Sequence, residues 1–262
     1  MVERSFFEWV WFLLEKFGPQ FVRGAGNTLL IALTGTVIGF VLGLIVAILR
    51  TIPIRQKDSP FKKVPLKLLS WLLGVYIEVF RGTPMIVQSM VIFYGSASMG
   101  LRMPVLFAAI FIISINTGAY MAEIIRGGII SVHTGQKEAA YAIGMTHWQS
   151  MVYVVLPQAV RNIMPSIGNE FVVNIKDSSV LNVISVNELF FASKSAAGTY
   201  LRYFEVFFIT ACIYLIMTFT VTRILRLLER RMDGNRNYTI HGSQTHSKSS
   251  IEILKGGKQY GK

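Results

Sequence analysis

The stretch Asn27–Leu49, NTLLIALTGTVIGFVLGLIVAIL, decides the fold class of this chain because it contains no charged residue. A helix that crosses the hydrocarbon core of a bilayer needs about 20 consecutive, mostly apolar residues, and this stretch is long enough. The whole chain has the same character: 52% of its 262 residues are hydrophobic, 15% are charged, and the mean hydropathy is +0.50. These values are typical of a polytopic membrane protein and argue against an ordinary soluble domain.

Four more apolar runs follow, so the sequence predicts an all-α membrane protein with five spans. The runs cover residues 66–97, 104–125, 159–186 and 203–225. Gly82-Thr83-Pro84 interrupts the second run and Pro165 interrupts the fourth, and a proline inside a helix removes one hydrogen bond. We therefore expect a break in both spans, which either lines a cavity or serves only packing.

The first span carries a repeat of small residues, with Gly35, Gly39 and Gly43 spaced four apart. Residues at this spacing lie on one face of a helix and allow another helix to approach closely. The repeat predicts a packing groove, which faces either another helix of this chain or a second membrane subunit.

The two ends of the chain differ from the predicted transmembrane domain, residues 27–232. Residues 1–26 mix charged residues with Phe and Trp and lack the pattern of a signal peptide, so we expect an amphipathic helix at the membrane interface. Residues 233–262 are polar and rich in Gly, Ser, Lys and Asn, which predicts a disordered tail. His241 and His246 lie in this tail, and a solvated tail is a better interpretation than a metal site. The single cysteine, Cys212, excludes a disulfide framework.

The distribution of Lys and Arg predicts the orientation in the membrane. Of the 26 such residues, 18 lie in three regions: residues 50–67, residues 126–161, and the end of the chain from residue 223. Cytoplasmic loops of membrane proteins are enriched in Lys and Arg. We therefore expect the N-terminus outside and the C-terminus in the cytosol, which requires an odd number of spans. This clustering between and after the spans also argues against nucleic acid as a partner, despite a net charge of +12.

A polar segment at residues 126–158 connects the third and fourth spans. Residues 137–147 predict a helix of about three turns, in which Ala139, Ala140, Ile143 and His147 lie near one face. The two alanines would let a partner's backbone come close, and Gly144 would permit a sharp turn. Pro157 begins the next span, as proline often does at a helix N-terminus.

This segment resembles the EAA loop of permease subunits from ABC-type importers. The chain has Glu138-Ala139-Ala140, three residues, Gly144, nine residues, and then Val154-Val155-Leu156-Pro157. It departs from the family pattern only in Val154, where the pattern has Ile. The resemblance implies a cytosolic coupling helix that docks into a cleft of a separate ATPase, and a connector helix without a partner is the alternative. The residues implied in coupling are Glu138, Ala139, Ala140, Ile143, Gly144, Leu156 and Pro157.

Three more segments resemble the polar amino acid branch of these permeases, the histidine, glutamine and arginine importers. They are AYMAEIIRGGIISVHTGQ at residues 119–136, VFRGTPMIVQ at residues 79–88, and the pair Asn169-Glu170 followed by KDSSV at residues 176–180. The last segment departs from the branch pattern at Ser178 and Val180. The resemblance covers about residues 20–232. It implies a type I ABC importer permease with five transmembrane helices, an N-terminal interfacial helix and the coupling helix.

Ionisable side chains inside the predicted spans are candidates for a substrate path. Each costs about 3 kcal/mol at the centre of a bilayer on insertion scales, so it should face a cavity or another polar group. An amino acid zwitterion needs a cation for its carboxylate and an anion for its ammonium, and Glu78 and Arg81 also have the spacing of a helical ion pair. Fastening helices together is the alternative role. With polar residues of the motifs, the candidates are Glu78, Arg81, Thr83, Gln88, Asn116, Glu123, Glu170, Lys176 and Asp177.

Sequence motifs of nucleotide binding and hydrolysis are missing: there is no G-x-x-x-x-G-K-[ST], no H-E-x-x-H and no G-x-S-x-G. We therefore expect no enzyme and no metal site, with no cofactor bound by this chain. The resemblance implies that ATP and Mg bind a partner ATPase. It also implies a second permease copy or a paralogous permease, an extracytoplasmic amino acid binding protein, a polar amino acid substrate, and lipid contacts in the bacterial cytoplasmic membrane.

Two other functions explain part of the sequence. A stand-alone ion-coupled carrier or channel would account for the spans and the intramembrane charges, but not for the spacing of residues 138–157. A membrane scaffold without transport activity would leave the charged residues of the spans without a purpose.

Overall fold

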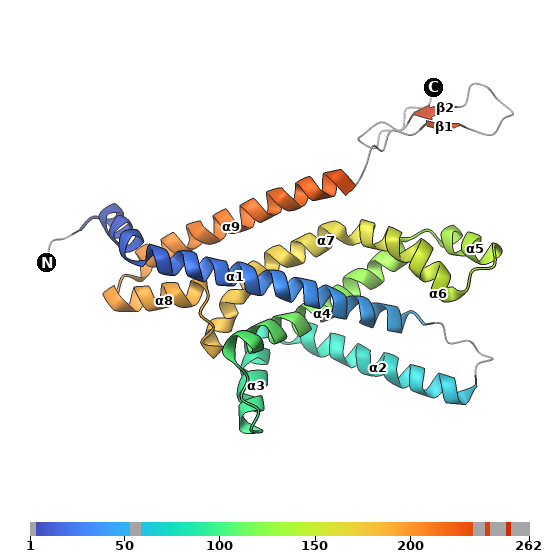
Figure 1. Ribbon diagram of the computed structural model, residues 1–262, viewed down its shortest axis with the longest axis horizontal. Helices are drawn as coiled ribbons and strands as arrows, with labels where there is room; N and C mark the ends of the chain where they lie inside the picture. Colours follow the sequence, from blue (N-terminus) through green and yellow to red (C-terminus); the bar gives the residue numbers. More distant parts are fainter. Residues whose placement is uncertain (1–3, 53–58, 233–238, 242–249, 253–262) are drawn as a thin grey trace.

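The computed structural model describes residues 4–52, 59–232, 239–241 and 250–252, and its elements are drawn in Figure 1. The membrane domain is all-α, as predicted. Its helices are α1 (Phe6–Arg50), α2 (Pro60–Gly82), α3 (Met85–Ser98), α4 (Val105–Ser131), α5 (Thr134–Ala142), α6 (His147–Gln149), the π-helix η1 (Ser150–Val155), α7 (Leu156–Asp177), the 3₁₀-helix η2 (Ser178–Ile184), α8 (Leu189–Tyr200) and α9 (Tyr203–Met232).

Two short strands lie in the C-terminal tail, β1 (Thr239–His241) and β2 (Ser250–Glu252), and they pair antiparallel. The rest of residues 233–262, for which the sequence predicts disorder, lies outside the described residues.

The interface between α1 and α4 forms the centre of the fold, and it uses the predicted glycine repeat. A Cβ atom at Gly39 would lie 2.7 Å from Cβ of Thr117, and one at Gly43 would lie 2.5 Å from Cβ of Met121. Gly35 packs in the same way against Ile113. Because no larger residue fits, the three glycines set how closely the two helices approach. The groove therefore faces α4 of the same chain.

The predicted interfacial segment and the first span form one helix, so residues 1–26 do not contain a separate helix. Ser5 begins α1 with a capping box to Glu8, and α1 continues through Pro19 to Arg50. Its N-terminal part bends away from the rest in Figure 1, as expected near a proline inside a helix. Buried Leu13, Phe17 and Phe21 pack in one cluster with residues of α8 and α9, and this packing holds the segment in the fold.

The structure only partly reproduces the five predicted spans. By length and apolar composition, three helices qualify among the described residues: α1, α4, and Tyr203–Arg231 of α9. The second run is divided by the break at Gly82–Pro84 into α2 and the shorter α3. The fourth run is divided into α7, which passes through Pro165, and the 3₁₀-helix η2. The predicted break at Pro165 is thus wrong: this proline is exposed at the helix surface, where the loss of one hydrogen bond is tolerated.

The connecting segments are divided between the two ends of the molecule. α5 and α6 lie at one end, together with the C-terminal end of α1 and the N-terminal end of α2, whereas α8 and the N-terminus lie at the other (Figure 1). Residues 50–67 hold six of the Lys and Arg residues and residues 126–161 hold three. The fold therefore gathers two of the three regions used for the orientation at the same end.

Candidate functional site

The predicted coupling segment forms a helical hairpin instead of one helix. α5 ends at Ala142, and Gly144 follows with a φ of +84°, a backbone conformation that favours glycine. α6 then starts at Thr146, whose side chain accepts a hydrogen bond from the Gln149 N–H while the Gln149 side chain accepts one from the Thr146 N–H. The predicted three-turn helix over residues 137–147 is therefore wrong, because a left-handed glycine and a new helix cap divide it.

The side chains of this hairpin divide into an inner and an outer set. Ala140 is buried against the protein, whereas Glu138 and Ala139 are exposed, and Ile143 is 76% exposed. The sequence predicts that Ala139, Ala140 and Ile143 lie near one face, but Ala140 is buried while the other two are exposed. The tip has aromatic neighbours: the Tyr141 hydroxyl lies 3.2 Å from Nδ1 of His147 and links the two arms. The hairpin therefore presents exposed apolar side chains at its tip.

The α5–α6 hairpin continues into α7 without a break in the helix. The π-helix η1 follows α6 directly and runs into α7, and the Leu156 N–H donates to the carbonyl of Met151 five residues earlier. A π-helix shifts the hydrogen-bond partner by one residue, and Pro157, which has no N–H to donate, follows at once. α7 begins at Leu156 with Pro157 in its first turn, as the sequence predicts, but it continues from η1 without a break. Met151 and Val155 are buried in a cluster with residues of α4, so the hairpin is packed onto the membrane domain.

Buried amide side chains hold the break between α2 and α3. Nε2 of Gln88 donates to the carbonyls of Phe80 (3.0 Å) and Thr83 (2.9 Å) and to the Thr83 hydroxyl (2.8 Å). Nδ2 of Asn116 in α4 donates to Oε1 of Gln88 at 2.9 Å. The amides thereby satisfy backbone carbonyls that the break leaves free. Gln88, Asn116 and Thr83, which the sequence places in the substrate path, form this brace in the structure.

Arg81 lies directly beside the same break and brings a positive charge to it. Its guanidinium stands over the Tyr120 ring at 5.5 Å from the ring centroid. It interacts electrostatically with Glu170 of α7, which also interacts with Asp177. Among the described residues, Arg81 forms no ion pair within 4 Å, and the pair with Glu78 that the spacing suggested is not made. The break thus lies near a cation, Arg81, and a carboxylate, Glu170, and neither of them forms an ion pair within 4 Å with a described residue.

The other predicted path residues lie elsewhere. Glu123 accepts from Arg126 at 2.8 Å and from Arg50 at 3.2 Å, so it fastens the end of α1 to α4. Glu78 lines a cavity of about 400 Å³ between α1 and α2, together with Arg50 and Lys67. Lys176 lines a different cavity between α7 and α9.

Residues 39–234 of this chain match the profile of the family described as "Binding-protein-dependent transport system inner membrane component". The chain belongs to this family. Its relatives include the glutamine transport system permease protein GlnP of Escherichia coli (strain K12), which is 38% identical over 220 residues, or 82% of this chain and 93% of that protein. The arginine transport system permease protein ArtQ of Bacillus subtilis (strain 168) is 32% identical over 218 residues, or 83% and 94%.

Solved structures agree with the family assignment. A chain in a crystal structure of an amino acid ABC transporter with histidines has a TM-score of 0.74 and 38% identity, and the match covers 83% of this chain and 96% of that chain. A chain of the inward-facing MetNI methionine ABC transporter has a TM-score of 0.68 at 20% identity and shows the shared fold alone. Because the family consists of membrane components of transport systems, this inner membrane component is not itself an enzyme.

Two polar groups of the inner membrane component were missed by the sequence reasoning. Nδ2 of buried Asn174 in α7 donates to Thr36 in α1 at 2.8 Å, and Oδ1 of Asn174 accepts from Thr117 in α4 at 3.1 Å. The three residues thus join three helices. The available signal was an Asn inside the predicted fourth span, since an amide in a membrane needs partners.

Glu188 is the second missed group. It is fully buried, caps α8 by accepting the N–H groups of Phe190 (2.8 Å) and Phe191 (2.7 Å), and also accepts from the Tyr214 hydroxyl (3.0 Å). An acidic residue just before an apolar helix was the signal for this cap.

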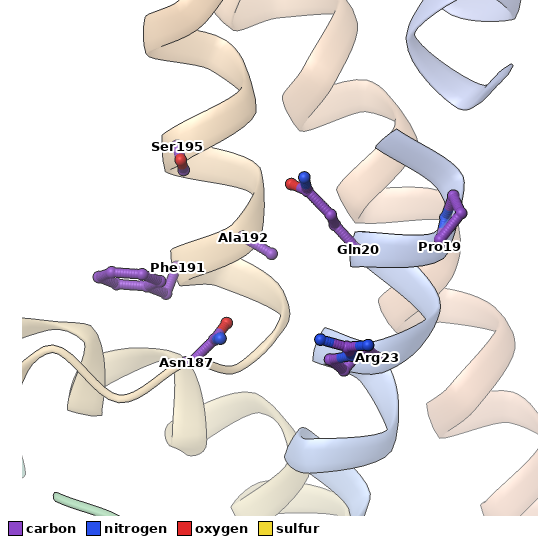
Figure 2. Close-up of a pocket in the computed structure, with 7 residues that line it drawn as sticks. All are labelled: Pro19, Gln20, Arg23, Asn187, Phe191, Ala192 and Ser195. Carbon is purple, nitrogen blue, oxygen red and sulfur yellow. The ribbon is translucent and has the colours of Figure 1, made fainter. Parts of the chain in front are cut away.

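A polar cavity of about 340 Å³ lies between α1 and α8, at the end of the inner membrane component opposite the α5–α6 hairpin. Figure 2 shows Gln20 and Arg23 of α1 on one side and Ser195 of α8 on the other, with Asn187 below. Nδ2 of Asn27 donates to the Asn187 carbonyl at 2.6 Å and holds the two elements together. The polar groups of this cavity therefore lie at the end of the molecule opposite the hairpin.

Proposed function

We propose that this chain is the permease subunit of an ATP-driven importer that moves a polar amino acid into the cytoplasm. The observation that carries the proposal is the α5–α6 hairpin, which has the spacing of a coupling loop and projects at the end of the molecule that holds the basic segments. Two relatives support the substrate class, since they are named for glutamine and arginine transport. The family description supports a partner that binds substrate outside the membrane.

The proposed importer permease crosses the membrane five times. The spans are α1, α2 with α3, α4, α7 with η2, and α9, and the N-terminus lies outside while the C-terminus lies in the cytosol. The α5–α6 hairpin then faces the cytosol, where ATP is available. The shared position of the basic segments at one end supports this orientation through the preference of Lys and Arg for cytoplasmic loops.

Coupling would use the continuous helical run from α6 through η1 into α7. An ATPase with ATP and Mg would bind the exposed surface of the hairpin at Glu138, Ala139, Ile143 and Gly144, while buried Ala140 supports that surface from within. Leu156 and Pro157 lie in the run that transmits a movement of the hairpin to α7. Two permease subunits, either two copies or this chain with a paralogue, would rock against each other around the substrate path.

The substrate path would pass the break between α2 and α3. Arg81 would bind the carboxylate of an amino acid, and Glu170 or Asp177 would bind its ammonium. The support is that Arg81 interacts with Glu170 without a direct ion pair, and that Asp177 interacts with Glu170 on the same helix. Thr83, Gln88 and Asn116 would keep the break in one conformation. An extracytoplasmic binding protein would deliver the substrate at the end that carries the α1–α8 cavity.

Copurification from the native membrane in mild detergent tests the proposal. The wild-type chain should bring an ATPase subunit with it, and Gly144→Asp should reduce the recovered ATPase at least about tenfold, because a side chain at φ +84° strains the turn and adds a charge to the docking surface.

The matched control for this copurification is Gly198→Asp in α8. Gly198 is also exposed with open space around it, but it lies at the other end of the molecule, so the variant should retain the ATPase. Equal ATPase recovery with Gly144→Asp and the wild type would contradict a docking role for the hairpin.

A further inference from the structure

A groove between α7 and α9 collects three cations around one cavity of about 270 Å³. Lys176 contributes from α7, and Arg223 and Arg226 contribute from α9, with Thr218, Phe219 and Thr222 between them. No carboxylate lines this cavity. The groove is therefore electropositive throughout, unlike the cavity between α1 and α2, which Glu78 also lines.

The three cations lack anionic partners in the part of the chain that the structure describes. None of them forms an ion pair within 4 Å with a described residue. Lys176 interacts electrostatically with its sequence neighbour Asp177, and the Arg223 guanidinium stands over the Phe219 ring at 4.8 Å. Unpaired cations on a membrane helix are costly and call for a counter-anion or an aqueous surface.

The hydroxyl groups of the groove do not supply that anion. The Thr218 hydroxyl donates to the Tyr214 carbonyl at 2.8 Å, and the Thr222 hydroxyl donates to the Thr218 carbonyl at 2.7 Å. Both hydroxyl hydrogens are thus used within α9. The donors that remain for a ligand are the ammonium and guanidinium groups, whose geometry suits the oxygens of a phosphate.

Apolar surface continues from the cations along the same helix. Leu215 is 67% exposed and Phe219 is 57% exposed, and both line the cavity. Leu215 lies about 16 Å from Arg226 along α9, at 1.5 Å per residue. A ligand that fits the whole groove therefore has an anionic head at Arg223 and Arg226 and an apolar body that reaches toward Leu215.

We propose that this groove binds an anionic glycerophospholipid of the inner leaflet, with its phosphate between Arg223 and Arg226 and an acyl chain along Phe219 and Leu215. The leaflet assignment rests on the orientation given with the proposed function, which puts the C-terminal end of α9 in the cytosol. Basic pockets between transmembrane helices on this side of a membrane are a known means of holding anionic lipid head groups.

Native mass spectrometry of the full-length chain in detergent tests this proposal, with phosphatidylglycerol and phosphatidylcholine added in separate titrations. We expect phosphatidylglycerol to bind at least about fivefold more tightly. The double variant Arg223→Gln/Arg226→Gln should weaken phosphatidylglycerol binding about tenfold and leave phosphatidylcholine unchanged, because each cation contributes to the attraction of the anionic head. The matched control is Arg230→Gln/Arg231→Gln, which removes two exposed cations of the same helix outside the cavity and should retain the preference.

Four outcomes would overturn the lipid site. Equal binding of the two lipids by the wild-type chain would remove the need for an anionic head. An equal loss in both double variants would show nonspecific attraction to a charged helix. If inorganic phosphate displaces phosphatidylglycerol at low millimolar concentration, the groove holds a free anion. If the Arg223→Gln/Arg226→Gln variant only separates a dimer, the groove holds a second copy of the chain. The measurement needs no ATPase and no amino acid, so its failure leaves the copurification result for the proposed function unaffected.

Discussion

The α1–α4 interface and the α5–α6 hairpin both depend on small residues, but they use them in opposite ways. At the interface, Gly39 and Gly43 are covered by side chains of α4, and the contact is complete within the chain. At the hairpin, Ala139 and Gly144 are exposed, a Cβ at Gly144 would meet nothing within 4 Å, and Ile143 is 76% exposed. Small residues that are covered fix the fold, whereas small residues that stay open beside an apolar tip leave space for a partner.

The largest expected effect is at the covered glycines. Gly43→Leu should prevent recovery of folded protein, with a cost of at least about 3 kcal/mol, because its Cβ alone would stand 2.5 Å from Cβ of Met121. Gly26→Leu is the control in the same helix, since nothing lies within 4 Å of that position. Size-exclusion profiles and melting temperatures in detergent would check this, and two variants of equal stability would refute close packing at Gly43.

The next effect is at the open hairpin, and it should appear in binding alone. Ile143→Asp should leave the melting temperature unchanged within about 1 °C, because the side chain is exposed, but it should weaken ATPase association about 30-fold by removing an apolar contact. The affinity can be measured by titrating the purified ATPase onto the immobilised permease. Val64→Asp changes a similarly exposed residue of α2 and should have no effect on affinity. A large fall in melting temperature for Ile143→Asp would mean that the hairpin tip belongs to the fold.

The smallest effect concerns the break between α2 and α3. The break is covered, like the α1–α4 interface, but its contacts are polar. Gln88→Leu should destabilise the chain by about 2 kcal/mol, since the Thr83 carbonyl loses its donor and the Phe80 carbonyl keeps only the longer bond from Asn116 at 3.3 Å. Asn116→Leu should cost less in the Gln88→Leu background than alone, because its bond to Gln88 at 2.9 Å is then already lost. Additive changes in melting temperature across the four proteins would show that the two amides do not form one brace.

Sequence reasoning worked where a residue acts through its size or charge alone. Long apolar runs located α1, α4 and α9, and the four-residue glycine spacing identified a real contact. It worked less well where a backbone conformation depends on the neighbours. The turn at Gly144 splits the expected helix because α6 begins its own cap at Thr146, and the expected break at Pro165 is absent because α7 tolerates the proline at its surface.

Partners distant in sequence explain the remaining differences. The sequence marks Gln88, Asn116 and Glu123 as polar in an apolar environment, but only the fold shows that the first two bind each other and that the third binds Arg50, 73 residues away. Of the charged candidates, Arg81 and Glu170 interact beside the break without a direct ion pair.

ATP-dependent uptake into proteoliposomes tests the central claim most directly. The permease would be reconstituted alone and together with its ATPase and binding protein, and uptake of labelled polar amino acids, among them glutamine, arginine and histidine, would be followed with and without ATP inside. We predict uptake only when ATPase, binding protein and ATP are all present, and loss of that uptake with Ile143→Asp. Uptake by the permease alone, driven by an ion gradient and unaffected by Ile143→Asp, would contradict the account and identify a self-sufficient carrier.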